Sequence, residues 1–121
     1  MCTVTTMSVG NRVFKVADIK QKYISNIIDA ASKCDIIDRV VLFGSCIDER
    51  CLESSDIDIA VFGSQVPSRA LVSKKYKSFA RQLYAFDDFS QDYDILYFKT
   101  GSKNKSLIMT DIDKGEVLYE R

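Results

Sequence analysis

Two aspartates interrupt a run of apolar residues in the middle of the chain. Asp56 and Asp58 flank Ile57 and are followed by the apolar residues 59–62, a pattern typical of a buried strand. Burying a bare carboxylate is costly unless a partner neutralises its charge. Because residues two apart on a strand share a face, the two carboxylates point the same way and could bind divalent ions. Such an ion is the neutralising partner that the sequence predicts.

A tight turn precedes these acids by ten residues. The β-branched run 40–43 predicts a strand that ends at Gly44 and Ser45. Glycine lets the backbone approach a ligand closely, and the amides of a short helix after it would form an anion site, to which the Ser45 hydroxyl adds a donor. Gly44 and Ser45 are therefore candidate phosphate-binding residues. Taken alone, they fit an ordinary strand-to-helix turn better.

A third carboxylate opens the next predicted strand, residues 93–98. Asp94 is the preferred candidate, and Asp92, which shares its face, is the alternative. An oxygen-only ligand set favours Mg²⁺ or Mn²⁺. Metal ions beside a phosphate site are what nucleotidyl transfer requires, because they stabilise the attacking and leaving oxygens, while a third carboxylate could orient or deprotonate the acceptor hydroxyl. Taken alone, Asp56 and Asp58 fit exposed edge-strand acids or a helix cap better, and it is their combination with Asp94 and the spacing that favours a site.

Composition narrows the classes of protein. The 121 residues are 46% hydrophobic and 28% charged, as expected for a single globular domain spanning 1–121. The 17 basic and 17 acidic residues cancel, which argues against binding to a nucleic-acid backbone. The four cysteines form no C-x-x-C pair and there is no histidine, so zinc binding, a disulfide framework and Ser-His or Cys-His catalysis are not expected. With no long apolar run and no leader pattern, we expect a cytoplasmic protein without a membrane segment.

Periodicity predicts a small sheet covered by helices. We expect a helix over 18–33 capped by Asp18, and a short helix from Ser45 followed by a loop. One long amphipathic helix from Pro67 to Phe86 follows, whose basic face, including Lys74 and Lys77, is better explained as solvated than as a contact with the triphosphate or an acidic partner. Residues 1–16 have the least definite pattern, with a hairpin about Gly10 and Asn11. The remaining predicted elements are strands 40–43, 57–62, 93–98 and 116–120, and a helix from Ser102 that ends at Gly115.

The spacing of the candidate site resembles a known signature. The segments "LFGS" and "SDIDIAV", separated by ten residues after Ser45, are similar to the G-S-x10-D-x-D motif of the minimal nucleotidyltransferase family, part of the DNA polymerase beta-like superfamily. The resemblance continues through "DYDILYF" to "KGEVLYE". It implies an α/β (α+β) fold with a mixed sheet flanked by helices, and Mg²⁺-dependent transfer of a nucleoside monophosphate from an NTP such as ATP. By position, Gly44 and Ser45 would bind nucleotide, and Asp56, Asp58 and Asp94 would be the catalytic metal ligands.

The resemblance also implies a partner. Members of this size are often paired with a helical HEPN-type ribonuclease toxin, which they neutralise by nucleotidylating a tyrosine hydroxyl. This chain departs from many relatives after Ser45, where Asp48 and Glu49 replace a basic element and would oppose a triphosphate, with Arg50 as the compensating charge. The alternative interpretation is a catalytically degenerate binding module that neutralises its partner by occlusion.

Overall fold

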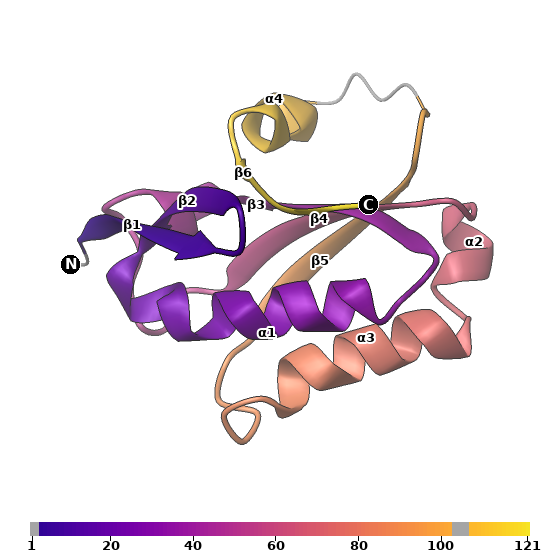
Figure 1. Cartoon of the computed structure of the whole chain (residues 1–121), viewed down its shortest axis with the longest axis horizontal. Coiled ribbons are helices and arrows are strands. Elements are labelled where there is room, and N and C mark those ends of the chain that lie inside the picture. Colours follow the sequence, from indigo (N-terminus) through magenta and orange to yellow (C-terminus); the bar gives the residue numbers. More distant parts are fainter. Residues whose placement is uncertain (1–2, 103–106) are drawn as a thin grey trace.

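The computed structural model describes residues 3–102 and 107–121, which form a mixed four-stranded sheet with helices on both faces and a separate hairpin (Figure 1). The strand order in the sheet is β5-β4-β3-β6. The elements are β1 (Val4–Val9), β2 (Arg12–Ala17), the 3-10 helix η1 (Asp18–Lys20), α1 (Gln21–Ser32), β3 (Ile37–Phe43), the 3-10 helix η2 (Gly44–Ile47), β4 (Ile57–Gly63), α2 (Pro67–Ala70), α3 (Lys74–Ala85), β5 (Tyr93–Lys99), α4 (Leu107–Asp113) and β6 (Glu116–Glu120).

The sheet combines antiparallel and parallel pairs. Strand β3 lies at its centre, antiparallel to both β4 and β6, whereas β4 and β5 are parallel. Parallel neighbours need a long crossover, which α2 and α3 supply here. The β3–β4 connection and the β4–β5 crossover both lead back to the end of the sheet where β3 stops. Strands β4 and β5 therefore begin at that end.

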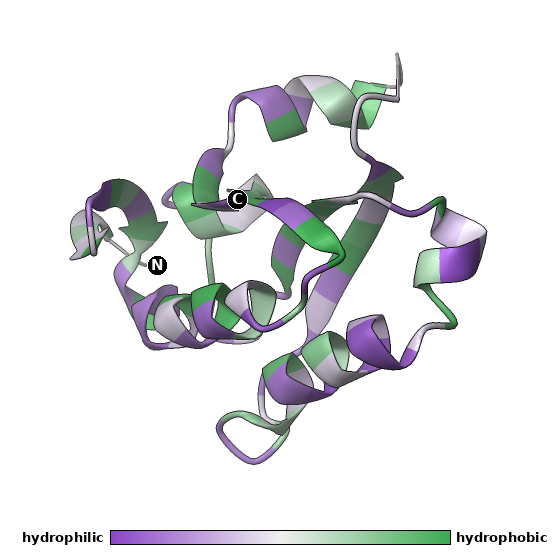
Figure 2. Cartoon of the chain, turned by 45° about the vertical axis from the view of Figure 1, so that its right-hand side comes forward, coloured by the Kyte–Doolittle hydropathy of each residue, from purple (hydrophilic) through white to green (hydrophobic). Residues whose placement is uncertain are grey.

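Each face of the sheet has its own apolar cluster. Leu42, Ile57 and Ile59 face α1 and α3 in the larger cluster, and Val41 and Ala60 face α4 in the smaller one. Figure 1 shows α1 and α3 on one side of the sheet and α4 on the other. Figure 2 shows alternating hydrophobic and hydrophilic bands along α1, α3 and the strands, as expected for elements that bury one side.

The N-terminal segment forms the hairpin that the sequence predicts. Strands β1 and β2 are antiparallel, and Gly10 occupies the turn with a φ of 59°, a conformation that glycine adopts without strain. Phe14 and Val16 are buried in the larger cluster. The hairpin therefore packs on the domain.

Two helix predictions need correction. The first helix begins as η1, and Asp18 does not cap α1, because its Oδ1 accepts from the Ile19 and Thr3 amides, at 2.8 and 3.2 Å. The helix predicted from Pro67 to Phe86 is divided into α2 and α3. Ser73 separates them, since its Oγ accepts the Tyr76 amide at 3.2 Å and caps α3. Val72, between the two helices, and Phe86, the extended residue that ends α3, are exposed rather than buried.

Other boundaries move less. Strand β3 begins at Ile37, three residues before its predicted start, and the predicted strands 57–62, 93–98 and 116–120 are confirmed. Ser102 is not helical, and residues 103–106, where the last helix was predicted to continue, lie outside the described residues. Helix α4 ends before Gly115, whose amide donates to the Ile112 carbonyl at 2.9 Å. No helix within the described ranges is long and apolar enough to cross a membrane.

Candidate active site

The structure places Asp58 and Asp94 side by side. Each is the second residue of its strand, and their Cα atoms are partners in the parallel register of β4 and β5. Both lie on the face covered by α4, since Ala60 in β4 and Leu96 in β5 share their parity and belong to that apolar cluster. Asp56, one residue before β4, also has this parity. Asp58 is half-buried, whereas Asp56 and Asp94 are exposed.

Mutual repulsion marks these carboxylates as a cluster of negative charge. The pKa of Asp58 is raised, first by burial and then by the charges of Asp94 and Asp56. Across the described residues, no basic side chain forms an ion pair or hydrogen bond with any of the three. The acids predicted to need a neutralising partner therefore have no cationic side chain supplying it within the described ranges.

The chemistry of these acids suits a divalent cation. Carboxylate oxygens from two adjacent strands suit Mg²⁺ or Mn²⁺, and a cation would offset the burial and the neighbouring negative charges that raise the pKa of Asp58. As the side chains stand in residues 3–102 and 107–121, no group of three acidic, cysteine or histidine side chains is close enough to hold a metal. Asp58 and Asp94 are the pair that the sheet itself brings together.

Asp92, the alternative to Asp94, has a backbone role. Its carbonyl accepts the Ile57 amide at 3.0 Å, which joins the starts of β4 and β5, and its side chain is exposed. Asp94 is the residue aligned with Asp58.

The predicted glycine turn lies directly against Asp58. Gly44 has a φ of 76°, and a Cβ at this position would overlap the Asp58 carboxylate. The turn continues as η2, whose Ser45 carbonyl accepts the Asp48 amide at 3.1 Å. The short helix predicted from Ser45 is therefore a 3-10 helix, which begins one residue earlier, at Gly44, and ends at Ile47. Gly44 thus lies directly against Asp58, and Ser45 follows it in the same turn.

Cys46, within η2, links this turn to the backbone of Asp56. The Cys46 thiol donates to the Asp56 carbonyl at 3.4 Å and is fully buried. Burial raises its pKa to about 12, so that it stays protonated at neutral pH. Cys46 therefore holds the backbone of Asp56 rather than acting as a nucleophile.

Arg50 neutralises one of the two acids that would oppose a phosphate. Its Nη2 lies 2.6 Å and its Nε 3.0 Å from Asp48 Oδ2, and its amide donates to Asp48 Oδ1 at 2.8 Å. The Arg50 hydrogen bond is the main reason that the pKa of Asp48 is lowered. Glu49 is exposed. The compensation expected of Arg50 is thus directed at Asp48 itself.

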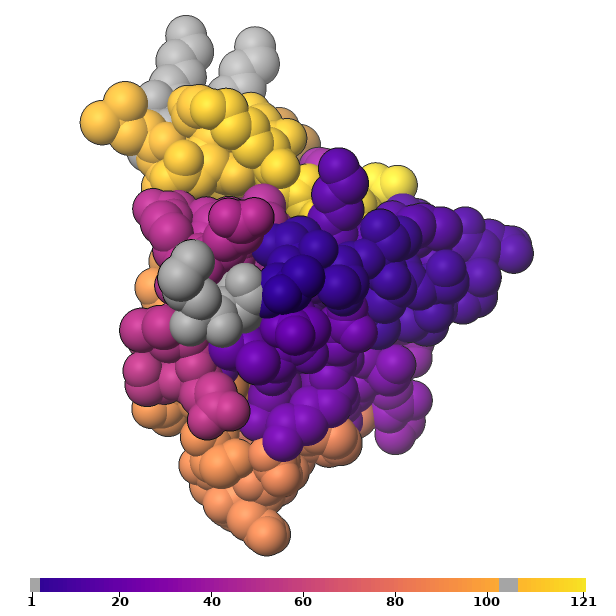
Figure 3. Space-filling view, turned by 90° about the vertical axis from the view of Figure 1, so that its left-hand side faces the viewer, coloured from indigo at the N-terminus to yellow at the C-terminus, as the bar shows by residue number. Residues whose placement is uncertain are grey.

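A pocket of about 370 Å³ opens beside the glycine turn. Figure 3 faces this end of the molecule and shows the segment that follows β3 beneath the yellow C-terminal part of the chain. The pocket is lined by Gly44, Ile47, Asp48, Arg50, Asp111 and Lys114. It combines two basic and two acidic side chains with the backbone turn, and so brings polar groups from the middle and the C-terminal part of the chain together beside Gly44.

The basic residues of α3 lie elsewhere. Tyr76, between Lys74 and Lys77, packs edge-on against Tyr97 near the carboxyl end of β5, whereas Asp94 is at the amino end. Both lysines are exposed. Their exposure is what a solvated helix face requires.

Sequence analysis did not single out two buried polar residues near the candidate carboxylates, Lys20 and Gln91, and it assigned Tyr84 only to packing. Lys20 and Gln91 are buried and hydrogen-bonded to each other, at 2.6 Å. A signal for Lys20 was present, because it occupies the first position of the buried stripe that continues with Tyr23, Ile24 and Ile27. The Tyr84 hydroxyl donates to the Tyr93 carbonyl at 3.0 Å, and its pKa is raised by burial and then by Asp92, Asp56 and Asp94.

Comparison with protein families agrees with this geometry. Residues 25–121 match the family model described as Polymerase beta, Nucleotidyltransferase. The match covers most of the chain, including the glycine turn and all the candidate carboxylates, and the chain belongs to this family. A search of curated proteins found no match. The fold and site define a domain of the nucleotidyltransferase type.

Proposed function

We propose that this chain is a Mg²⁺-dependent nucleotidyltransferase that transfers AMP from ATP to a hydroxyl on a partner protein. The observation that carries the proposal is the alignment of Asp58 with Asp94, with the Gly44 backbone packed against Asp58. Asp56, Asp58 and Asp94 would hold the metal, and Gly44 and Ser45 would receive the phosphates. Bound Mg²⁺ would stabilise the negative charge of the attacking and leaving oxygens.

The proposed reaction exchanges one phosphorus–oxygen bond for another. The acceptor oxygen bonds to the α-phosphorus while the bond to the β-phosphate bridging oxygen breaks, which releases pyrophosphate. The exposed Asp94 carboxylate is the candidate acceptor of the hydroxyl proton, because it lies beside Asp58 but is less buried.

The acceptor is the least constrained part of the proposal. The Gly44 to Asp58 spacing resembles that of minimal nucleotidyltransferases, which supports a helical HEPN-type toxin as the partner and a tyrosine as its modified residue. The chain would then be the antitoxin of the pair. A gene for a small, all-helical protein beside this one is the expected genomic context.

Transfer of label from α-labelled ATP tests the activity. With Mg²⁺ and the partner, the wild-type chain should label the partner. Asp58→Asn and Asp94→Asn should each lower the rate by at least the roughly 10–100-fold that loss of an outer-shell partner costs a metal site. Asp88→Asn, an exposed acid in the α3–β5 loop, is the control and should keep full activity. Equal labelling by all four proteins would contradict the proposed site.

An occluding module is the competing proposal. It was favoured by the acids after Ser45, and the pairing of Arg50 with Asp48 weakens that argument. Asp58→Ala separates the two functions in cells that express the toxin, because an occluding antitoxin should still protect them and an enzymatic one should not. Calorimetry with ATP, with and without Mg²⁺, gives a second test, and metal-linked heat is expected of the enzyme.

A further inference from the structure

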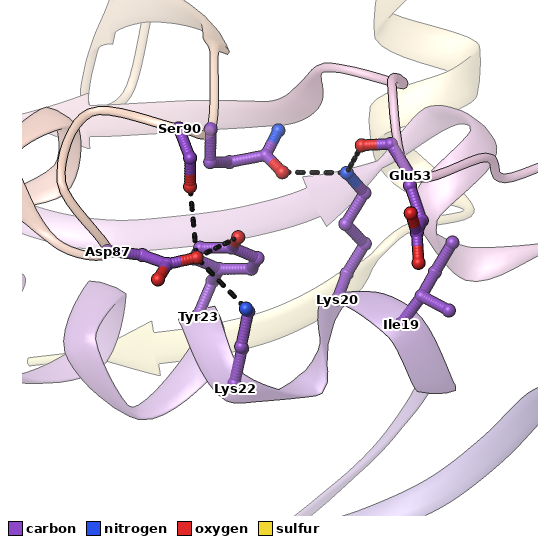
Figure 4. Close-up of a pocket in the computed structure, with 8 residues that line it drawn as sticks. Ile19, Lys20, Lys22, Tyr23, Glu53, Asp87 and Ser90 are labelled. Atoms are coloured by element: carbon purple, nitrogen blue, oxygen red, sulfur yellow. Dashed lines mark hydrogen bonds and ion pairs between the residues drawn. The ribbon is translucent and has the colours of Figure 1, made fainter.

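Lys20 is a buried lysine whose charge is satisfied without a carboxylate. It ends η1, and only 1% of its surface is exposed. Its ammonium donates to the Glu53 carbonyl at 2.9 Å, the Ser55 carbonyl at 2.8 Å and Gln91 Oε1 at 2.6 Å. These three bonds use all of its donors. Figure 4 shows its side chain reaching from the start of α1 towards the Glu53 segment.

The acceptors of Lys20 lie just before the two strands that carry the candidate metal ligands. Ser55 directly precedes Asp56, which is followed by β4, and Gln91 lies three residues before Asp94 of β5. Gln91 strengthens the connection, since its Nε2 donates to the Ser55 carbonyl at 3.0 Å and to the Asp92 carbonyl at 2.6 Å. The buried side chains of Lys20 and Gln91 therefore join the segment before β4 to the segment before β5.

Packing alone does not explain why a lysine and a glutamine are buried at these positions. An apolar side chain could fill the same space without the cost of burying an ammonium group. Parallel strands also have no tight turn between them, so their first residues are aligned by the backbone ladder and by contacts just before it. Beyond the ladder that begins at Ile57 and Tyr93, Lys20 and Gln91 provide those contacts.

We propose that Lys20 and Gln91 are positioning residues that set the distance between the β4 carboxylates, Asp56 and Asp58, and Asp94 of β5 for binding a divalent cation. This inference rests on the proposed function. Lys20 itself does not touch the reacting groups, because its three donors are directed at the backbone and amide beneath the acids. Its effect is transmitted through the carbonyls of residues 53, 55 and 92.

Binding of Mn²⁺ alone to the full chain, followed by electron paramagnetic resonance, tests this role without requiring an acceptor. Lys20→Met and Gln91→Met keep the size of each side chain and remove the connection. Each should weaken Mn²⁺ binding by roughly 10–100-fold, the effect typical of second-shell substitutions. Lys22→Met is the matched control, because Lys22 is the exposed lysine two residues away and pairs with Asp87. It should leave the Mn²⁺ affinity unchanged.

The outcomes separate positioning from simple stabilisation. A purely structural role would lower the melting temperature of the variants but leave the Mn²⁺ affinity of the folded protein unchanged, and that result would overturn the inference. If Lys20→Met does not fold, Gln91→Met carries the test. Absence of Mn²⁺ binding in the wild-type chain would overturn the proposed function and this inference together, whereas binding that only Asp58→Asn weakens would overturn the inference alone.

Discussion

At the level of single residues, Gly44 brings the backbone of the predicted phosphate turn directly against the Asp58 carboxylate of β4. Its positive φ is unfavourable for other residues, and the space for a side chain is already filled by the Asp58 carboxylate. The residue is therefore constrained twice, by its backbone and by its neighbour. Since Asp58 is a candidate metal ligand, any shift at this turn moves the site itself.

Replacing Gly44 with alanine separates these two constraints when Gly10→Ala is the control. Gly10 has a φ of 59° but open space where a Cβ would lie, so its variant pays only the backbone cost, about 1 kcal/mol. Gly44→Ala pays a similar backbone cost and also displaces Asp58. In urea denaturation, Gly44→Ala should lose clearly more unfolding free energy than Gly10→Ala. Equal losses would show that Asp58 can move aside freely.

The raised pKa of Asp58 predicts that its charge opposes folding. The folded state keeps this proton to higher pH than the unfolded chain, so stability falls as pH rises through the folded pKa. Removing the charge with Asp58→Asn should therefore raise the melting temperature at pH 7 in metal-free buffer. The gain should disappear at a pH where the wild-type carboxyl is protonated in both states.

Added Mg²⁺ should reverse this order of stability. The ion binds the folded wild-type site and should raise its melting temperature, while Asp58→Asn gains little. Thermal scans at several metal concentrations measure the effect, with Asp88→Asn as a variant that should follow the wild type. The site assignment fails if Asp58→Asn gains as much from the metal as the wild-type chain does.

At the level of elements, local patterns predicted the strands and tertiary contacts decided the rest. Alternation in residues 57–62 and the apolar run 93–98 were sufficient to predict β4 and β5, and the D-x-D spacing was sufficient to place two acids on one face. The division between α2 and α3 depends on the Ser73 cap, whose signal is weaker than the apolar period that runs through it. The buried Lys20 has acceptors 33 to 71 residues away, which no local pattern contains.

The Ser73 cap offers a test of why the predicted long helix is divided. Ser73→Ala removes the acceptor of the Tyr76 amide and should cost about 1 kcal/mol of unfolding free energy. Ser78→Ala, an exposed position inside α3, is the control and should be neutral or slightly stabilising, because alanine is the better helix former. Urea denaturation of both variants measures the difference. A cost that is the same at both positions would argue against the cap.

At the level of the whole molecule, the loop between α3 and β5 connects α1 and α3 with the end of the sheet where Asp58 and Asp94 lie. Asp87 in this loop accepts from the Tyr23 hydroxyl at 2.9 Å and the Ser90 hydroxyl at 2.9 Å, and its Oδ2 lies 2.9 Å from Lys22 Nζ. Figure 4 shows these partners gathered around one carboxylate. The same loop ends at Gln91 and Asp92, so Asp87 holds the loop to α1, and the Lys20 connection holds η1 to the residues just before β5.

This arrangement predicts an acid-sensitive contribution to global stability. The hydrogen bond from Lys22, followed by those from Tyr23 and Ser90, lowers the pKa of Asp87 from 3.8 to about 2. A lowered pKa gives stability that is present above the unfolded value and is lost as pH falls through the folded one. Asp87→Asn should therefore be less stable than the wild type at pH 5, and the difference should shrink as the pH approaches 2.

Asp88→Asn is the matched control, because both positions have a positive φ that asparagine tolerates, 61° and 55°. Urea denaturation of both variants across this pH range measures the effect, and a flat difference for Asp87→Asn would show that the loop is held to α1 by contacts other than this carboxylate.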